Sequence, residues 1–178
     1  GPAGNSAAEI LRQRPEIGFA RLLQGVAYIN QGRLLEAEPV LVELLRRDPE
    51  NRDGKYNLGL VFFRTERLDK AEGLFAAAYE SKPPDLRGLL GLVEIDVSRK
   101  QFDRALGRLD AALQKEPGNK VLQAAKASAA VRGGKYTEAS AMFRKLAEAD
   151  PTNYDLRMRL AETFRLQGDW GQAAEAWK

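Results

Sequence analysis

The sequence predicts an all-α fold, a right-handed α-solenoid (superhelix) of antiparallel helix pairs with a 34-residue period. Three series of residues carry this prediction. Prolines recur at Pro15, Pro49, Pro83, Pro117 and Pro151, and alanines recur at Ala3, Ala37, Ala71, Ala105, Ala139 and Ala173. A large apolar residue follows four positions after each alanine from Ala37 onward, as Leu41, Phe75, Leu109, Phe143 and Trp177. A constant spacing of this length is the signature of a repeat array.

Each repeat is expected to hold two amphipathic helices joined by a short turn. In the first repeat we expect a helix over 18–31, a turn at Gly32, a second helix over 34–47 and an end at Pro49. Proline ends the second helix because it lacks an N–H donor and restricts the residue before it. The recurring alanine marks the close approach of the paired helices.

The turns between paired helices are expected near residues 32, 66, 100, 134 and 168, and no strand is expected within 18–168. Glycine occupies three of these places, whereas Glu66 and Lys100 hold the other two. The glycine signal for the turn is therefore partial.

The period divides the chain into six segments. We expect a cleavage scar and half-repeat over 1–17, full repeats over 18–51, 52–85, 86–119 and 120–153, and a truncated fifth repeat over 154–178. Ser6 and Glu9 form a capping box for a short helix ending before Pro15. We also expect apolar surface left at Trp177 to favour self-association through the truncated ends.

Composition excludes several classes of function. The chain has no Cys and no His, so it lacks disulfides, thiolate metal sites and the usual general base. The 28 Lys and Arg against 25 Asp and Glu leave +3 with no basic arm or acidic tail, which is unlike a nucleic-acid-binding protein. No phosphate-binding loop or nucleophile motif occurs. We expect no enzymatic activity, no cofactor, no metal, no nucleic-acid partner and no direct membrane insertion, and the compartment, cytoplasm or periplasm, stays open.

The pattern resembles the tetratricopeptide repeat over nearly the whole chain. Leu58, Gly59 and Phe62 match its motif in the second repeat, and Gly25 and Tyr28 match it in the first. The sequence departs from the pattern where a tryptophan is usual, since Arg21, Lys55, Leu89, Gln123 and Arg157 stand there, and at Asp96, where an aromatic residue is expected and looser packing would follow. Pentatricopeptide RNA readers have a similar hairpin, but their typical period of 35 and the even charge of this chain argue against them.

The resemblance implies a concave surface lined by the first helix of each repeat, where another polypeptide binds. The inward-lining places of the first three repeats hold Phe19, Leu22, Val26 and Ile29; Asp53, Tyr56, Leu60 and Phe63; and Arg87, Leu90, Glu94 and Val97. The fourth and fifth repeats hold Val121, Ala124, Ser128 and Val131, then Asp155, Met158, Glu162 and Arg165. The lining therefore grades from apolar to small to charged.

Because soluble proteins rarely leave large apolar patches uncovered, the stretch from Phe19 to Leu90 predicts a site for an apolar or amphipathic segment. The expected partner-binding residues are Phe19, Leu22, Val26, Ile29, Tyr56, Asn57, Leu60, Phe63, Arg87, Leu90, Glu94 and Val97. Tyr56 and Phe63 are the expected anchors, in contact with solvent, and Asn57 is the single match to members that clamp chaperone carboxyl termini. In an alternative interpretation the first helix is rotated and buries Leu22, Leu23 and Val26 structurally.

These observations predict a non-catalytic scaffold that binds another protein or peptide in its groove, as one segment of a larger bacterial-type assembly or secretion protein. The alternative is a structural spacer or self-association module within a longer repeat protein.

Overall fold

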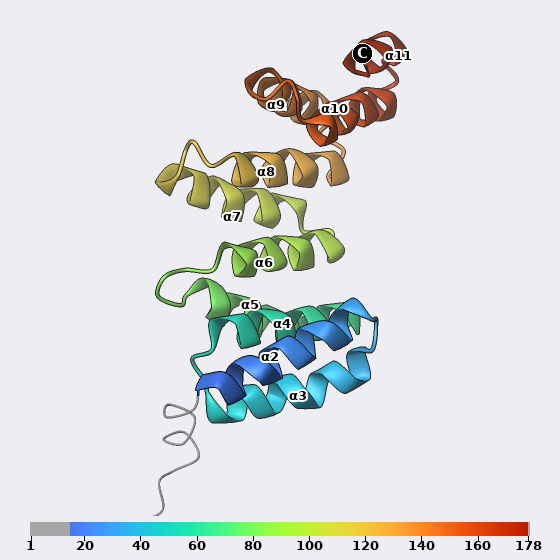
Figure 1. Ribbon diagram of the computed structural model, residues 1–178. Coiled ribbons are helices and arrows are strands. Elements are labelled where there is room, and N and C mark those ends of the chain that lie inside the picture. The colour runs from blue at the N-terminus through green and yellow to red at the C-terminus, as the bar shows by residue number, and fades with distance from the viewer. Residues whose placement is uncertain (1–14, 178) are drawn as a thin grey trace, which may run out of the picture. The chain divides into compact units, whose positions relative to one another are not determined.

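The chain is described by a computed structural model that covers residues 15–177, and these residues form ten helices and no strand (Figure 1). The helices are α2 (Pro15–Asn30), α3 (Leu34–Arg47), α4 (Arg52–Arg64), α5 (Leu68–Tyr79), α6 (Leu86–Ser98), α7 (Phe102–Lys115), α8 (Lys120–Arg132), α9 (Tyr136–Ala149), α10 (Tyr154–Gln167) and α11 (Trp170–Ala176). The predicted all-α repeat fold is confirmed.

The first helix begins earlier than the sequence suggested. Pro15 was expected to end a preceding short helix, but it is the first residue of α2, three residues before the expected start. Proline is well suited to this position, because the first turn of a helix leaves its N–H groups without intrahelical partners. The capping box at Ser6, the cleavage scar and most of the half-repeat lie outside the described residues.

The chain divides into two compact units, Gly1–Ile95 and Asp96–Lys178, with the boundary inside α6. In the first unit α2 packs along α3, α4 packs along α5, and α3 and α4 are in contact (Figure 1). In the second unit each of the helices from α7 to α11 packs on the next. Each unit therefore consists of consecutive helices in antiparallel contact.

The predicted turns are confirmed, and they share one backbone conformation. The residues with positive φ are Gly32 (74°), Glu66 (58°), Lys100 (59°), Gly134 (76°) and Gly168 (86°), which recur every 34 residues. In each case the left-handed residue follows the first helix of a pair and lets the chain reverse. Glu66 and Lys100 adopt this conformation despite the steric cost of a Cβ atom.

The core follows the two apolar series. The repeated alanines from Ala37 to Ala173 are buried, and so are Leu41, Phe75, Leu109 and Phe143. The glycines of the first helices permit close packing, because a Cβ on Gly25 would lie 2.6 Å from Leu41 Cδ2, and one on Gly59 would lie 2.8 Å from Phe75 Cδ1. Trp177, the last member of the series, is 66% exposed.

The place where Asp96 replaces an aromatic residue is filled by ion pairs. Its side chain is fully buried, with Oδ2 2.7 Å from Arg108 Nε and Oδ1 3.4 Å from Arg104 Nε. A buried carboxylate needs such partners because it has lost its hydration. The expected looser packing is therefore replaced by charged side chains that reach Asp96 from α7.

A fourth periodic series caps the first helices. Asn51, Asn119 and Asn153 accept hydrogen bonds from backbone N–H groups at the starts of α4, α8 and α10. Asp85, at the equivalent position before α6, accepts a hydrogen bond from the Arg87 backbone N–H at 3.0 Å. These caps satisfy N–H groups that a helix start leaves unpaired.

Candidate functional site

The structure separates the twelve predicted site residues by accessibility. Phe19, Arg87 and Glu94 are exposed; Leu22, Val26, Tyr56, Leu60, Phe63 and Leu90 are half-buried; and Ile29, Asn57 and Val97 are buried. Ile29 belongs to the hydrophobic core of the first unit, and Val97 lies beyond the unit boundary. Ile29 and Val97 therefore do not belong to an accessible surface of this unit.

The amide of Asn57 is engaged within its own helix. Its Nδ2 donates to the Asp53 carbonyl oxygen at 2.8 Å, and the side chain is buried. Because the amide group donates to the backbone of its own helix, Asn57 stabilises α4.

One face of α2 is apolar and accessible. Phe19 is 61% exposed and Leu23 is 52% exposed, and they lie one turn apart on the helix. Leu22 and Val26, both half-buried, lie on the same side, because residues three and four apart share a helix face. The rotated-helix alternative does not hold for Leu23, which it would have buried. We call these four residues the α2 face.

Tyr56 and Phe63 are not free in solvent. Both pack against the buried cluster of the first unit, and the Tyr56 ring centroid is 5.9 Å from that of Phe75. The Arg87 guanidinium carbon lies 4.6 Å from the Tyr56 ring centroid, in the geometry of a cation–π contact. Removing either aromatic side chain would therefore cost packing as well as surface, although both are half-buried and so partly in contact with solvent.

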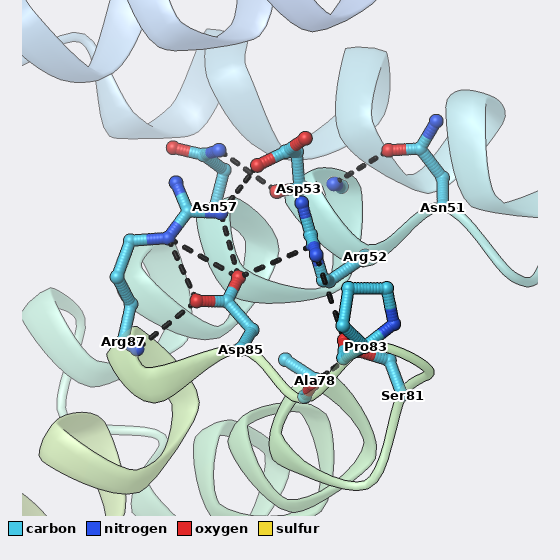
Figure 2. Close-up of polar contacts among 10 residues, drawn as sticks. Asn51, Arg52, Asp53, Asn57, Ala78, Ser81, Pro83, Asp85 and Arg87 are labelled. Atoms are coloured by element: carbon cyan, nitrogen blue, oxygen red, sulfur yellow. Dashed lines mark hydrogen bonds and ion pairs between the residues drawn. The ribbon is translucent and has the colours of Figure 1, made fainter.

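A polar network links the starts of α4 and α6 (Figure 2). The Arg87 guanidinium pairs with Asp53, one repeat earlier, and with Asp85, whose Oδ2 accepts from Arg87 Nη2 at 2.6 Å. Arg52 Nε lies 3.8 Å from the same Asp85 oxygen, and Arg52 Nη1 donates to the Pro83 carbonyl at 3.5 Å. We call Arg52, Asp53, Asp85 and Arg87 the Arg87 network. It links Arg87 and Asp53, which lie 34 positions apart on the first helices of consecutive repeats.

The network changes the acid–base properties of its members. Burial by itself would raise the pKa of Asp85, but the hydrogen bonds from Arg87 and the charges of Arg87 and Arg52 outweigh it and hold the pKa below its ordinary value. The hydrogen bond to Asp85 is the main reason that the pKa of Arg87 is raised. Both groups are therefore kept charged.

Beside this network lies a polar hollow of about 590 Å³. The start of α4 and the loop after α5 line it, with Arg52, Asp53, Glu80 and Lys82 among its charged residues. The signs of these charges are mixed, so the hollow does not select for one charge of ligand.

The second unit has a cavity of about 490 Å³, which we call the Trp177 cavity. It is lined by Ser128, Val131 and Arg132 of α8, by Met158, Arg159, Glu162 and Thr163 of α10, and by Phe143 and Trp177. Four of these residues, Ser128, Val131, Met158 and Glu162, belong to the inward-lining series identified in the sequence. The predicted site omitted them because the lining of the last two repeats looked small and charged rather than apolar.

Two observations bear on other kinds of site. Within residues 15–177 no group of three or more Asp or Glu side chains is arranged to hold a metal ion. None of the helices described for this stretch of chain is long and apolar enough to cross a bilayer.

Helix pairs that repeat every 34 residues, with a left-handed turn and a buried alanine in each, define the class as an α-helical repeat protein. One tetratricopeptide repeat model matches residues 22–85 and 124–177, and a second matches 62–129. This chain belongs to the tetratricopeptide repeat family. Such repeats are typically non-catalytic modules that bind other proteins or peptides, and the chain is accordingly a protein–protein interaction scaffold.

Solved structures share this fold at low identity. PilF of Pseudomonas aeruginosa is 20% identical with a TM-score of 0.74, and the match covers 92% of this chain and 75% of that one. A thermophilic tetratricopeptide repeat protein of Thermus thermophilus is 19% identical with a TM-score of 0.73, covering 89% and 87%. YrrB, described as having an unusual peptide-binding site, is 18% identical with a TM-score of 0.60, covering 98% and 90%. None of the curated proteins compared with this chain matches it.

Proposed function

We propose that the first unit binds an apolar or amphipathic polypeptide segment along the first helices of its repeats. The observation that carries the proposal is the α2 face. Phe19 and Leu23 are more than half exposed, and Leu22 and Val26 extend the apolar stripe along the same side of the helix. An exposed apolar stripe of this kind fits a partner that brings apolar side chains of its own.

The proposed surface also includes Tyr56, Leu60, Phe63 and Leu90 of the following first helices, which are half-buried. Half-buried side chains of this size can still contribute area when a partner covers them. The charged residues Arg87 and Glu94, both exposed, would orient a bound segment by charge. Arg87 is suited to this because the Arg87 network holds its guanidinium in place.

We further propose that the chain works within a larger bacterial assembly or secretion protein. The support is that structures of this fold come from bacterial proteins such as PilF, and that YrrB is described as having a peptide-binding site. At this level of identity the likeness concerns the fold, so the partner has to be identified by experiment.

The test uses two substitutions on the α2 face that leave the core intact. A library of random peptides displayed on phage is selected against the chain, and recovered peptides are measured against Phe19→Ser with Leu23→Ser. We expect apolar or amphipathic peptides, and a loss of affinity of at least about tenfold in the double variant, because each good anchor contributes on the order of 2 kcal/mol.

The matched control is Leu35→Ser with Val42→Ser, two exposed apolar residues of α3, which should keep the affinity of the original chain. Circular dichroism should show the same helicity in all three proteins. If the α2 variant bound the selected peptides as tightly as the original chain, the proposed surface would be wrong. If no peptide were recovered, the spacer or self-association role would be favoured instead.

A further inference from the structure

We infer that the second unit has a binding site of its own: the Trp177 cavity takes a large apolar side chain from an acidic polypeptide segment. This site lies on residues other than those of the α2 face. It suits a different kind of partner than the α2 face does, because arginine side chains lie beside its apolar interior.

The cavity has an apolar interior that is open to a ligand. Of its apolar lining residues, Phe143 is buried, Val131 is half-buried, and Met158 and Trp177 are 47% and 66% exposed. Its volume of about 490 Å³ lies within the range of protein pockets that bind small-molecule ligands. Tryptophan supplies a large contact area, and methionine adapts its shape to different apolar groups. These residues suit a leucine-sized or aromatic side chain better than a polar one.

The charges around this interior favour a carboxylate. Arg132 comes from α8 and Arg159 from α10, and both line the cavity. Arg159 Nη1 donates to Ser128 Oγ at 3.1 Å and its Nε donates to Asp155 at 2.7 Å, so the guanidinium is positioned across the two helices. The acidic lining residue, Glu162, is paired with Arg165 at 2.6 Å.

A third arginine lines a second hollow beside Met158 and Trp177. A smaller hollow of about 240 Å³ shares these two residues and is also lined by Tyr154, Arg157, Ala176 and Asp155, the last of which is paired with Arg159. The Arg157 guanidinium carbon lies 4.6 Å from the Tyr154 ring centroid, and its buried Nε has no hydrogen-bond partner within the described chain. The guanidinium therefore adds a third positive charge beside Met158 and Trp177.

The charge of the whole unit has the same sign. Residues 96–178 contain 15 Lys and Arg against 11 Asp and Glu, which leaves +4, whereas residues 1–95 contain 13 against 14. The positive excess therefore belongs to the unit that holds the cavity. An acidic segment would be attracted to it, and the arginines near Met158 and Trp177 would receive its carboxylates.

The experiment uses Trp177 as the reporter. The chain has two tryptophans, so Trp170→Phe leaves Trp177 as the single fluorophore. The probe is a short acetylated and amidated peptide whose central leucine is flanked by glutamates, with two matched peptides that carry lysines for the glutamates or alanine for the leucine. We expect a blue shift of Trp177 emission with the first peptide, and binding at least about tenfold tighter than either matched peptide.

Substitutions then locate the site. Met158→Ala and Arg159→Gln should each weaken binding of the glutamate–leucine peptide by about tenfold, because they remove an apolar wall and a positioned charge. Val121→Ala and Lys145→Gln, an exposed apolar residue and an exposed cation outside the cavity lining, are the matched controls and should not change it. Circular dichroism checks that each variant keeps its helicity.

Equal binding of the lysine peptide would overturn the inference of an acidic partner, and equal binding of the alanine peptide would overturn the apolar pocket. Unchanged binding in both Met158→Ala and Arg159→Gln, or no binding of the glutamate–leucine peptide, would overturn the site itself. The Phe19→Ser and Leu23→Ser variant should retain this binding, so a failure of the α2 face and a failure of the Trp177 cavity can be told apart.

Discussion

Asp85 combines a helix-capping role with a buried charge, and its ionisation should be visible in the stability of the first unit. Its side chain is 6% exposed, and its pKa lies below the ordinary value of 3.8 because hydrogen bonds from Arg87 outweigh the effect of burial. The Asp85 carboxylate therefore binds a proton more readily in the unfolded chain than in the folded chain. The stabilisation is present above pH 3.8 and is lost as the pH falls through the folded-state pKa.

Asp85→Asn is expected to lower the free energy of unfolding at neutral pH by about 1–3 kcal/mol, because Arg87 loses a charged partner. The difference from the original chain should shrink in acid, as the original carboxyl group becomes protonated. Urea unfolding between pH 7 and pH 2 measures both effects. Glu43→Gln is the control: hydrogen bonds from Arg46 and Arg47 lower the pKa of Glu43 to about 2, but these two ion pairs are more exposed than Asp85 and should matter far less. If the loss of stability in Asp85→Asn grew in acid, the ionised Asp85 carboxylate would not be the stabilising group.

Lys100 adopts a backbone conformation that favours glycine, with φ of 59°. Lys100→Gly should therefore raise the free energy of unfolding by about 0.5–1 kcal/mol, since glycine avoids the Cβ clash of the left-handed region. The reciprocal change is Gly134→Ala, where φ is 76° and a Cβ would meet nothing within 4 Å. It should cost about 1 kcal/mol through backbone strain alone. Thermal unfolding of both variants checks this, and a lower Tm for Lys100→Gly would contradict it.

At the scale of helices, α5 packs through the Phe75 ring against glycines of its neighbours. A Cβ on Gly91 of α6 would lie 2.6 Å from Phe75 Cγ. Gly91→Ala should lower the free energy of unfolding by about 1–3 kcal/mol, as should Ala71→Leu in α5, because both overpack a close helix contact. Gly73→Ala, on the exposed side of α5 with open space around it, should instead raise it by about 1 kcal/mol. Urea unfolding measures all three, and a common direction of change would contradict this packing.

For the molecule as a whole, the division into two units predicts that a destabilising substitution in one unit lowers mainly the stability of that unit. Phe143 is buried in the core cluster of the second unit, and Phe143→Ala should cost about 3–5 kcal/mol there. Because stability in repeat arrays is a sum of repeat and neighbour terms, hydrogen exchange should accelerate in α8 to α10 and stay nearly unchanged in α2 to α5. Exchange followed by mass spectrometry resolves these segments. A uniform loss of protection across both units would show that they unfold as one.

The architecture could be predicted from the sequence because its signals are local and repeated. The alanine and proline series predict the same helix pair in each repeat, and this period located the turns at Glu66 and Lys100 even though neither residue is glycine. Helix boundaries depend mainly on such neighbouring residues, and the second helix of the first repeat has the predicted bounds, Leu34–Arg47. The asparagine and Asp85 caps also follow the period, so the same analysis could have found them.

Accessibility of the candidate site was decided by the tertiary structure. The sequence placed Phe19, Ile29 and Val97 on one inward-lining series, yet Phe19 is exposed, while Ile29 and Val97 are buried. The exposure of a side chain depends on what neighbouring helices place beside it, and those neighbours lie far away in the sequence. Arg87 reaches Asp53 across 34 residues, and Arg159 reaches Ser128 across 31. Helical periodicity determined which way each residue faces, but only the packed repeats decided which residues are open to a partner.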